Sequence, residues 1–442
     1  MSFSPDRLIV FIPRLRESKK CFVGYSGGLD SQVLLQAVVE LLGADAVAAI
    51  HVNHQLSPHA GVWQQHCENS CRELGVELIV ETVAVVPDGQ GVEDAARSAR
   101  YKVFERHLTT GSLLLLAHHA DDQVETVLYR LLRGSGPRGL SGIPANRQVG
   151  QGELLRPLLS FTRSELQAYA EQKKLGWVDD ESNADTDFDR NFIRHRLLPP
   201  LRERWPDYAA RVAHSAALCR DNDELAAMLA AQDLIAVYER EERLGWSISV
   251  EAMLHLEELR RANLLRHWPE HHQMAPPAHR AVETALTELL PAREDAEPVV
   301  SWGGVQLRRY QRRLYLLPRK MEDKRDLPES TLWALPGTLS LADDSFLEAT
   351  REQGRGLWVP EGERLEIRYR QGGERCKPFG RSGSNTLKRL FQEYSVEPWL
   401  RDQVPLLYLH DQLVAVADLW ICDGFFATPE QSGWSIQWSF SG

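Results

Sequence analysis

The sequence predicts an α/β protein in which a parallel-sheet nucleotide-binding domain is followed by a small helical domain and an α+β C-terminal domain. Up to about residue 180, short apolar runs alternate with helical periods, the rhythm of a parallel sheet covered by helices on both faces. Between about residues 210 and 290, Ala and Leu recur at spacings of three and four, which is typical of helices. We expect the three domains to occupy residues 1–210, 211–325 and 326–442.

Each expected element of the first domain follows from its local pattern. Uninterrupted apolar runs suit strands that are buried on both faces. The expected strands cover residues 21–25, 46–52, 76–85 and 113–117. The expected helices cover residues 31–42, 60–74, 92–107 and 121–133. Ligands of such sheets bind beyond the carboxyl ends of the strands.

The later elements change character along the chain. Helical spacing continues through residues 211–234, 253–268 and 279–290. After residue 298 the chain becomes strand-like, at residues 305–317, 332–342, 361–370 and 406–421. These patterns place an α+β domain at the C-terminal end.

Composition narrows the class of protein. The 442 residues are 43% hydrophobic and 26% charged, as in globular domains, which excludes a disordered chain, a collagen and a coiled coil. The net charge of −11 opposes general attraction to nucleic acid or anionic lipid. Six scattered cysteines without a CxxC suggest neither a disulfide framework nor a zinc ribbon, and a cytoplasmic location fits best. No apolar stretch reaches the 18 or so residues of a membrane span, so we expect no membrane partner.

The most informative stretch joins the first expected strand to its helix. It reads Val-Gly-Tyr-Ser-Gly-Gly-Leu-Asp-Ser over residues 23–31. Gly27 and Gly28 let the backbone approach a ligand closely, and the amides that begin the helix suit a phosphate. Asp30 would repel phosphate unless a divalent cation lies between them, which suggests Mg²⁺. No lysine follows the glycines, so the loop is not of the GxxxxGK[ST] kind.

Two alternatives concern glycine-rich turns. The loop at residues 23–31 could be a simple turn in which Asp30 or Ser31 caps a helix, although its place after a buried strand favours phosphate binding. Residues 134–139 match the dinucleotide pattern GxGxxG, but they follow a helix and contain Pro137. We interpret that second match as a loop.

The residues 26–31 resemble the PP-loop ATP pyrophosphatases, which use SGGxDS to hold the pyrophosphate of ATP. Three further segments resemble one family of that class, the tRNA(Ile)-lysidine synthetases: residues 117–143, 177–199 and 387–408. The resemblance implies that the first domain is a PP-loop domain. It also implies that ATP is bound through Ser26, Gly27, Gly28, Leu29, Asp30 and Ser31.

The resemblance implies a particular chemistry. These enzymes adenylate the C2 carbonyl of the wobble cytidine of tRNA(Ile) with a CAU anticodon and release pyrophosphate. Free L-lysine then displaces AMP and forms lysidine, which changes codon specificity from AUG to AUA. ATP and Mg²⁺ are the expected cofactors. The oligomeric state stays open, with a homodimer among the states considered.

Polar residues follow the fourth strand, where a parallel sheet presents its ligands. His118 and His119 end the strand, and Asp122 and Glu125 share a face of the next helix. Two carboxylates there suit a cationic amino acid, and the resemblance implies His118 as catalytic and Asp122 with Glu125 as lysine ligands. His119 stays undecided, Asp121 with Glu125 is a competing pair, and a metal site is less favoured because adjacent strand residues point in opposite directions.

Arg97 lies on the expected helix 92–107, where its guanidinium could neutralise charge on the α-phosphate during catalysis. An ion pair with Glu93, four residues earlier, is an equal alternative.

Basic residues gather in two segments. Arginines interleave with Phe192 and Trp205 between residues 190 and 204, which is typical of an RNA contact but also of a helix face paired with neighbouring aspartates. The second segment, residues 364–401, has nine basic and four acidic side chains. The candidate tRNA-binding residues are Arg190, Asn191, Arg194, Arg375, Lys377, Lys388 and Arg389.

Other functions are weighed against this hypothesis. A tRNA thiolation enzyme with the same loop usually needs reactive cysteines, and the sequence has no CxxC. An amidotransferase synthetase would need a glutaminase domain, and none is recognisable. A non-catalytic tRNA-binding protein would not need the carboxylates of Asp30, Asp122 and Glu125.

Overall fold

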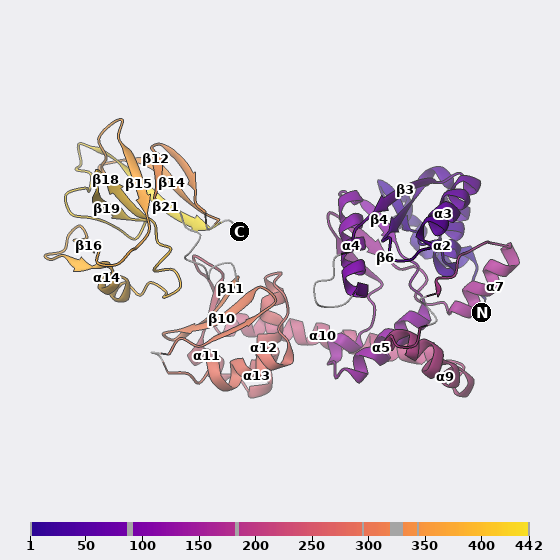
Figure 1. Cartoon of the computed structure of the whole chain (residues 1–442). Helices are drawn as coiled ribbons and strands as arrows, with labels where there is room; N and C mark the ends of the chain where they lie inside the picture. Colours follow the sequence, from indigo (N-terminus) through magenta and orange to yellow (C-terminus); the bar gives the residue numbers. More distant parts are fainter. Residues whose placement is uncertain are drawn as a thin grey trace. The chain divides into compact units, whose positions relative to one another are not determined.

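The computed structural model describes residues 2–85, 92–181, 185–293, 296–318, 330–342 and 344–440, with the side chains of residues 92–94 left aside. The chain forms two compact units, Met1–Glu224 and Leu225–Gly442, which we describe one at a time (Figure 1). Within the described residues, no helix is both long enough and apolar enough to cross a membrane.

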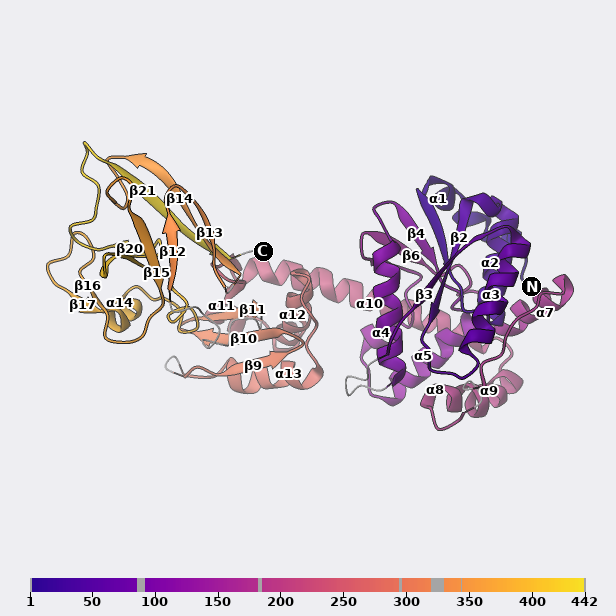
Figure 2. The same cartoon turned by 45° about the horizontal axis from the view of Figure 1, so that its top comes forward.

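The N-terminal unit is built on a six-stranded sheet with the spatial order β3-β2-β1-β4-β6-β5 (Figure 2). All neighbouring strands run parallel except β5, which pairs antiparallel with β6. The strands are β1 Lys20–Gly24, β2 Val47–Asn53, β3 Glu77–Thr82, β4 Ser112–Leu115, β5 Asn146–Val149 and β6 Gly152–Leu155. The predicted parallel sheet is therefore confirmed, with β1 and its loop near the centre.

Helices cover both faces of this sheet because the buried strands are apolar on both sides. Alternate residues of β1 enter different cores: Cys21 and Val23 pack with α2, α3 and α7, whereas Phe22 packs with α4. The larger helices are α2 Leu29–Leu42, α3 Ala60–Leu74, α4 Val92–His107, α5 Ala120–Leu132 and α7 Arg163–Lys173. The shorter ones are η1 Pro5–Phe11, α1 Ile12–Glu17, η2 Ala44–Ala46, α6 Pro137–Leu140, α8 Asp189–Phe192, the π-helix η4 Ile193–Leu197 and α9 Leu198–Arg204. The GxGxxG match begins in the turn after α5 and continues into α6, which starts at Pro137, so its interpretation as a loop is correct only for residues 134–136.

The middle region combines helices with a sheet. The long helix α10, Tyr208–Ala236, is followed by α11 Val250–His255, α12 Glu258–His271, α13 His279–Thr284 and the π-helix η5 Ala285–Leu289. They confirm the expected helical region. An antiparallel sheet of order β7-β8-β11-β10-β9 accompanies them, of which only residues 305–317 were expected as strands. The strands are β7 Arg240–Glu241, β8 Trp246–Ser249, β9 Val299–Trp302, β10 Val305–Tyr310 and β11 Arg313–Pro318.

The C-terminal region is rich in strands and has one described helix, α14 Leu387–Glu393. Its larger sheet has the order β12-β15-β18-β19-β20, and a second has the order β13-β14-β21. The strands are β12 Ser330–Ala334, β13 Gly337–Ser340, β14 Ser345–Gln353, β15 Arg364–Arg368, β16 Arg375–Cys376, β17 Asn385–Thr386, β18 Leu406–Leu409, β19 Gln412–Val416, β20 Trp420–Ile421 and β21 Ser432–Phe440.

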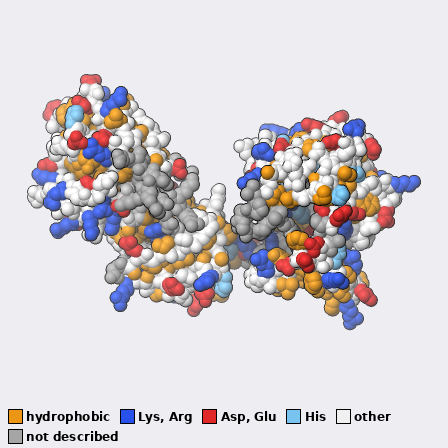
Figure 3. All heavy atoms as spheres, in the orientation of Figure 1, with side chains coloured by type: hydrophobic (Ala, Val, Ile, Leu, Met, Phe, Trp, Pro, Cys, Tyr) orange, Lys and Arg blue, Asp and Glu red, His pale blue; other side chains and the backbone are white. Residues whose placement is uncertain are grey.

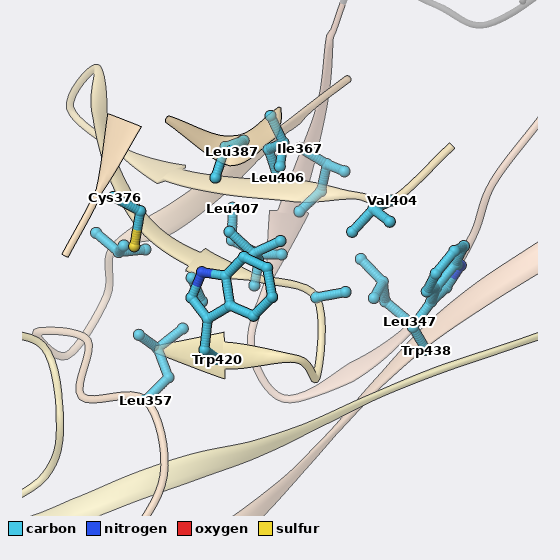
Figure 4. Packing of buried hydrophobic residues seen from close by; sticks show 14 of the residues in the cluster. Leu347, Leu357, Ile367, Cys376, Leu387, Val404, Leu406, Leu407, Trp420 and Trp438 are labelled. Atoms are coloured by element: carbon cyan, nitrogen blue, oxygen red, sulfur yellow. The ribbon is translucent and has the colours of Figure 1, made fainter. Parts of the chain in front are cut away.

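One core joins the middle and C-terminal regions. Leu347, Ile367, Leu407 and Trp420 pack at its centre (Figure 4). Leu317 of the middle region belongs to the same cluster, which explains why both regions form one unit. The predicted boundary between residues 325 and 326 lies outside the described residues.

The structure contains a disulfide, which the scattered cysteines of the sequence did not suggest. Cys376 and Cys422 form a disulfide across 46 residues, with 6.0 Å between their Cα atoms. No local pattern indicates this pairing, because it is the fold, through a bridge between Pro378 and Cys422, that brings the two segments together. Cys67 and Cys71 are buried in the first core.

Candidate active site

The loop between β1 and α2 forms an open cradle of backbone amides. Gly27 has a φ of +81°, and a Cβ there would lie 2.8 Å from the Sγ of Cys67, so glycine is required. Gly28 is the N-cap residue before α2 and donates its own amide to the Ser26 hydroxyl at 3.3 Å, while no described side chain caps the first amides of α2. The Ser31 hydroxyl braces the turn by donating to the Gly28 carbonyl at 3.0 Å, and it lies 3.1 Å from the Ser26 hydroxyl. Uncapped helix amides are suited to an anion.

Asp30 lies in the first turn of α2 and does not cap the helix. Its Oδ1 is buried and has no hydrogen-bond partner among the described residues. Its Oδ2 lies 3.6 Å from Nε2 of His119. A buried carboxylate oxygen without a donor suits a hard cation such as Mg²⁺, so the residues present fit the metal expected from the sequence.

The two histidines after β4 have different environments. Burial lowers the pKa of His118 to about 3, with Arg156 and Arg97 adding to the effect, so its imidazole is neutral at pH 7. Nε of Arg156 donates to Nδ1 of His118 at 3.2 Å, which leaves the proton on Nε2. His118 is therefore a hydrogen-bond donor through Nε2.

His119, which sequence reasoning left undecided, is a positioning residue. It is 2% exposed and forms a capping box at the start of α5, in which its backbone N–H donates to Oδ2 of Asp122 at 2.9 Å. Burial alone would lower the pKa of His119, but the surrounding carboxylates of Asp122, Asp30 and Asp121 outweigh burial and raise it. The His119 side chain therefore lies between the loop carboxylate and the first turn of α5, with its Nε2 3.6 Å from Oδ2 of Asp30 and 3.6 Å from Oδ2 of Asp122.

The structure brings Asp122 and Glu125 together and adds Arg194 to them. Nε and Nη2 of Arg194 bind the two oxygens of Glu125 at 2.6 and 2.9 Å, and Nη2 lies 3.3 Å from Oδ1 of Asp122. Burial raises the pKa of Glu125, with Arg194 opposing the rise. Arg194 lies in the π-helix η4, an irregularity common at functional sites. The sequence predicted a tRNA contact for this arginine, whereas the structure places it on the expected lysine ligands.

The competing pair of Asp121 with Glu125 does not form. Asp121 is 3% exposed and turns away to bind the start of α7, where its Oδ2 accepts from the Arg163 amide at 2.7 Å. Its Oδ1 accepts from Arg202 at 2.9 Å and from the Tyr208 hydroxyl. Asp121 thus caps the N-terminus of α7 and does not cap α5, the helix in which it lies.

Arg97 lies on α4 and donates from Nη2 to the Tyr101 hydroxyl at 3.4 Å. The alternative pair with Glu93 lies outside the described side chains. Sequence reasoning missed Arg156, which is 3% exposed beside His118. The sequence contains a feature that could have identified Arg156 as a site residue. It is the first charged residue after the apolar end of β6, at the edge where parallel sheets bind ligands.

The remaining candidate residues lie in two places. Arg190 donates to Thr126 of α5 at 3.2 Å, and Asn191 donates to the Asp185 carbonyl at 2.8 Å, so both belong to the N-terminal unit. The segment 177–199, which resembles the tRNA(Ile)-lysidine synthetases, also contains Asn183, which lies outside the described residues.

The C-terminal candidates lie on or near β16 and α14, where Figure 3 shows a group of Lys and Arg side chains. Lys377 pairs with Asp423 at 2.6 Å and Arg389 with Glu393 at 3.3 Å, while Arg375 donates to the Ser384 carbonyl at 3.0 Å. Lys388 is exposed on α14.

A parallel sheet with an uncapped SGGxDS loop after β1 defines a PP-loop enzyme, and residues 6–201 match the family model described as the PP-loop domain. Residues 248–315 match the TilS substrate binding domain and residues 365–438 the TilS substrate C-terminal domain. The chain is 38% identical over 440 residues to a tRNA(Ile)-lysidine synthase of Coxiella burnetii, covering 98% of this chain and 96% of that one.

Two further relatives carry the same name. One, from Alkalilimnicola ehrlichii, is 39% identical over 430 residues, covering 96% of this chain and 95% of its own. Another, from Vibrio cholerae, is 40% identical over 412 residues, covering 91% of each chain. The chain belongs to the tRNA(Ile)-lysidine synthase family. Membership excludes the thiolation and amidotransferase alternatives.

Proposed function

We propose that this chain ligates L-lysine to C2 of the wobble cytidine of tRNA(Ile) with a CAU anticodon, with ATP as the activating substrate. The supporting observation is the site itself, in which a loop with uncapped helix amides, a carboxylate oxygen with no described partner and a buried carboxylate pair lie within one unit. The full-length similarity to named synthases supports the same assignment.

The loop supplies the proposed nucleotide site. The first amides of α2, with the Ser26 and Ser31 hydroxyls, would hold the pyrophosphate of ATP. Asp30 would hold Mg²⁺ through its unpartnered Oδ1, and that ion would offset phosphate charge. His118, neutral with its proton on Nε2, would donate to an oxygen of the α-phosphate, and Arg97 would neutralise the charge that develops there.

The carboxylate pair supplies the proposed lysine site. Arg194 makes two charged hydrogen bonds to Glu125 and one longer one to Asp122, whose other oxygen accepts from the His119 backbone N–H, so both carboxylates contribute negative charge to the proposed lysine site. The lysine ammonium would bind there, and Arg194 would keep Glu125 ionised beside it. The neutral state of His118 excludes it as a cationic competitor for the same carboxylates.

The test incubates the purified chain with ATP, radiolabelled lysine and CAU-anticodon tRNA(Ile). We expect label in the tRNA only when ATP is present, and none with methionine tRNA of the same anticodon. Asp30→Asn serves as the inactive variant and Asp45→Asn, an exposed aspartate near the end of α2, as its matched control. Absence of label from tRNA(Ile) with the wild-type chain would overturn the proposal.

A further inference from the structure

Three arginine side chains of the N-terminal unit gather around Tyr101. The guanidinium carbon of Arg97, from the same helix, lies 5.1 Å from the Tyr101 ring centroid. That of Arg147, from β5, lies 4.4 Å from it. Arg156, at the end of β6, adds its charge to the same surroundings of Tyr101. Arg97 and Tyr101 come from α4, whereas Arg147 and Arg156 come from the hairpin of β5 and β6.

Arg156 is held firmly in place. It is 3% exposed, and its Nη1 donates to the Pro144 carbonyl at 2.7 Å while its backbone N–H donates to the Ala145 carbonyl at 2.9 Å. Its Nε donates to His118 at 3.2 Å. A buried, oriented cation therefore connects the arginine cluster to a candidate catalytic residue.

The charge of the arginine cluster is not balanced by any carboxylate whose side chain the structure describes. Within the part of the chain that the structure describes, Arg97, Arg147 and Arg156 form no ion pair with a carboxylate. Burial alone would raise the pKa of Tyr101, but the neighbouring arginines hold it below its ordinary value. Burial lowers the pKa of Arg156, and Arg147 and Arg97 lower it further. Holding these positive charges close together costs electrostatic free energy, and a bound anion would reduce that cost.

The position of the arginine cluster and the exposure of Arg147 favour an RNA phosphate over the pyrophosphate of ATP as the bound anion. The pyrophosphate has its own amides at the end of β1, whereas β6 and β5 lie two and three strands along the sheet from β1. Arg147 is exposed, so its guanidinium can reach a macromolecule. A wobble base that enters the site leaves its flanking phosphates at the rim, where guanidinium groups bind them well.

We propose that Arg97, Arg147 and Arg156, arranged around Tyr101, bind a phosphodiester of the anticodon-loop backbone next to the wobble nucleotide. The inference rests on the proposed function and adds a phosphate contact to it. Because Arg97 also has a proposed catalytic role and Arg156 is buried, exposed Arg147 is the residue to test.

The experiment compares Arg147→Ala with Arg106→Ala, an arginine of α4 that is paired with Glu81 at 3.1 Å. We expect Arg147→Ala to raise the KM for tRNA(Ile) about tenfold and to reduce the slope of log affinity against log salt by about 0.7, the value for one contact to a single strand. The KM values for ATP and lysine, and inhibition by pyrophosphate, should stay at wild-type values. Arg106→Ala should match wild type.

A modified RNA locates the contact. An anticodon stem-loop with one neutral methylphosphonate beside the wobble nucleotide, and a 2′-O-methyl group on the preceding sugar, should bind wild type and Arg147→Ala equally. Unmodified stem-loop should bind Arg147→Ala more weakly. An unchanged tRNA KM in Arg147→Ala, or a change confined to lysine KM or pyrophosphate inhibition, would overturn the inference. Lysine incorporation by wild type in the same assay separates this failure from failure of the proposed function.

Discussion

At the scale of single residues, Glu125 carries the clearest test of the lysine site. It is 2% exposed and is bound at both oxygens by Arg194. Glu125→Gln keeps the shape but removes a negative charge beside the proposed ammonium position, so we expect the KM for lysine to rise about tenfold, which corresponds to about 1.4 kcal/mol of lost attraction. The KM for ATP should change little. Steady-state kinetics with each substrate varied in turn measure both values.

Glu171→Gln is the matched control, since Glu171 is an exposed glutamate of α7. Its kinetic constants should equal those of wild type. An unchanged lysine KM in folded Glu125→Gln would contradict the assignment of the carboxylate pair.

Gly27 tests the geometry of the phosphate loop. Its φ of +81°, and the 2.8 Å that would separate an alanine Cβ from the Sγ of Cys67, make alanine strained there. We expect Gly27→Ala to lower the free energy of unfolding by about 1–3 kcal/mol and to abolish ATP-dependent lysine incorporation. Urea denaturation and the labelling assay measure the two effects.

Gly61→Ala provides the comparison, because Gly61 lies in α3 with no atom within 4 Å of a Cβ. Alanine there should be neutral or stabilise by about 0.4–1 kcal/mol. Equal stability losses at Gly27 and Gly61 would contradict the argument from loop conformation.

At the scale of secondary-structure elements, Asp121 ties α5 to the start of α7. Burial alone would raise its pKa, but Tyr208, the Arg163 amide, His119 and Arg202 together lower it. A lowered carboxyl pKa contributes stability above the unfolded-state value of about 3.9 and loses that contribution as the pH falls.

We therefore expect Asp121→Asn to lower the free energy of unfolding by about 1.5–3 kcal/mol at pH 7. The difference from wild type should shrink as the pH falls from about 5 through the lowered pKa of Asp121, as followed by urea denaturation across that range. Asp221→Asn, at an exposed position of α10, should show no such pH-dependent loss. A loss at Asp121 that is constant with pH would indicate packing alone.

The elements near the loop were predictable because their signals are local. Apolar runs and helical spacing place β1 and α2, and one string of six residues marks the turn between them. The sheet of the middle region was harder, since β7 has two residues and β8 has four, too few to show alternation. The position of Arg194 could not be predicted either, because it depends on how η4 packs against α5.

At the scale of the whole molecule, the negative net charge hides local basic segments. Lys388 and Arg389 of α14 belong to the C-terminal unit, whereas the carboxylates and the loop belong to the N-terminal unit. We expect the double change Lys388→Ala with Arg389→Ala to raise the KM for tRNA about tenfold and to leave the KM for ATP unchanged. Steady-state kinetics, with the concentrations of tRNA and ATP varied separately, measure the two KM values.

Arg355→Ala is the control for that change, because Arg355 is 79% exposed in the same unit and pairs with Glu352. It should leave both constants unchanged. A parallel rise in the KM for ATP would contradict separate roles for the two units.

The central claim is that this one chain converts the wobble cytidine of tRNA(Ile) to lysidine with consumption of ATP. Mass spectrometry of nucleosides from tRNA treated with the chain, ATP and lysine tests it most directly. We predict that lysidine replaces cytidine at the wobble position, with one AMP and one pyrophosphate released for each lysidine formed. Unmodified cytidine, with the chain folded and its ATP site competent for binding, would contradict the account.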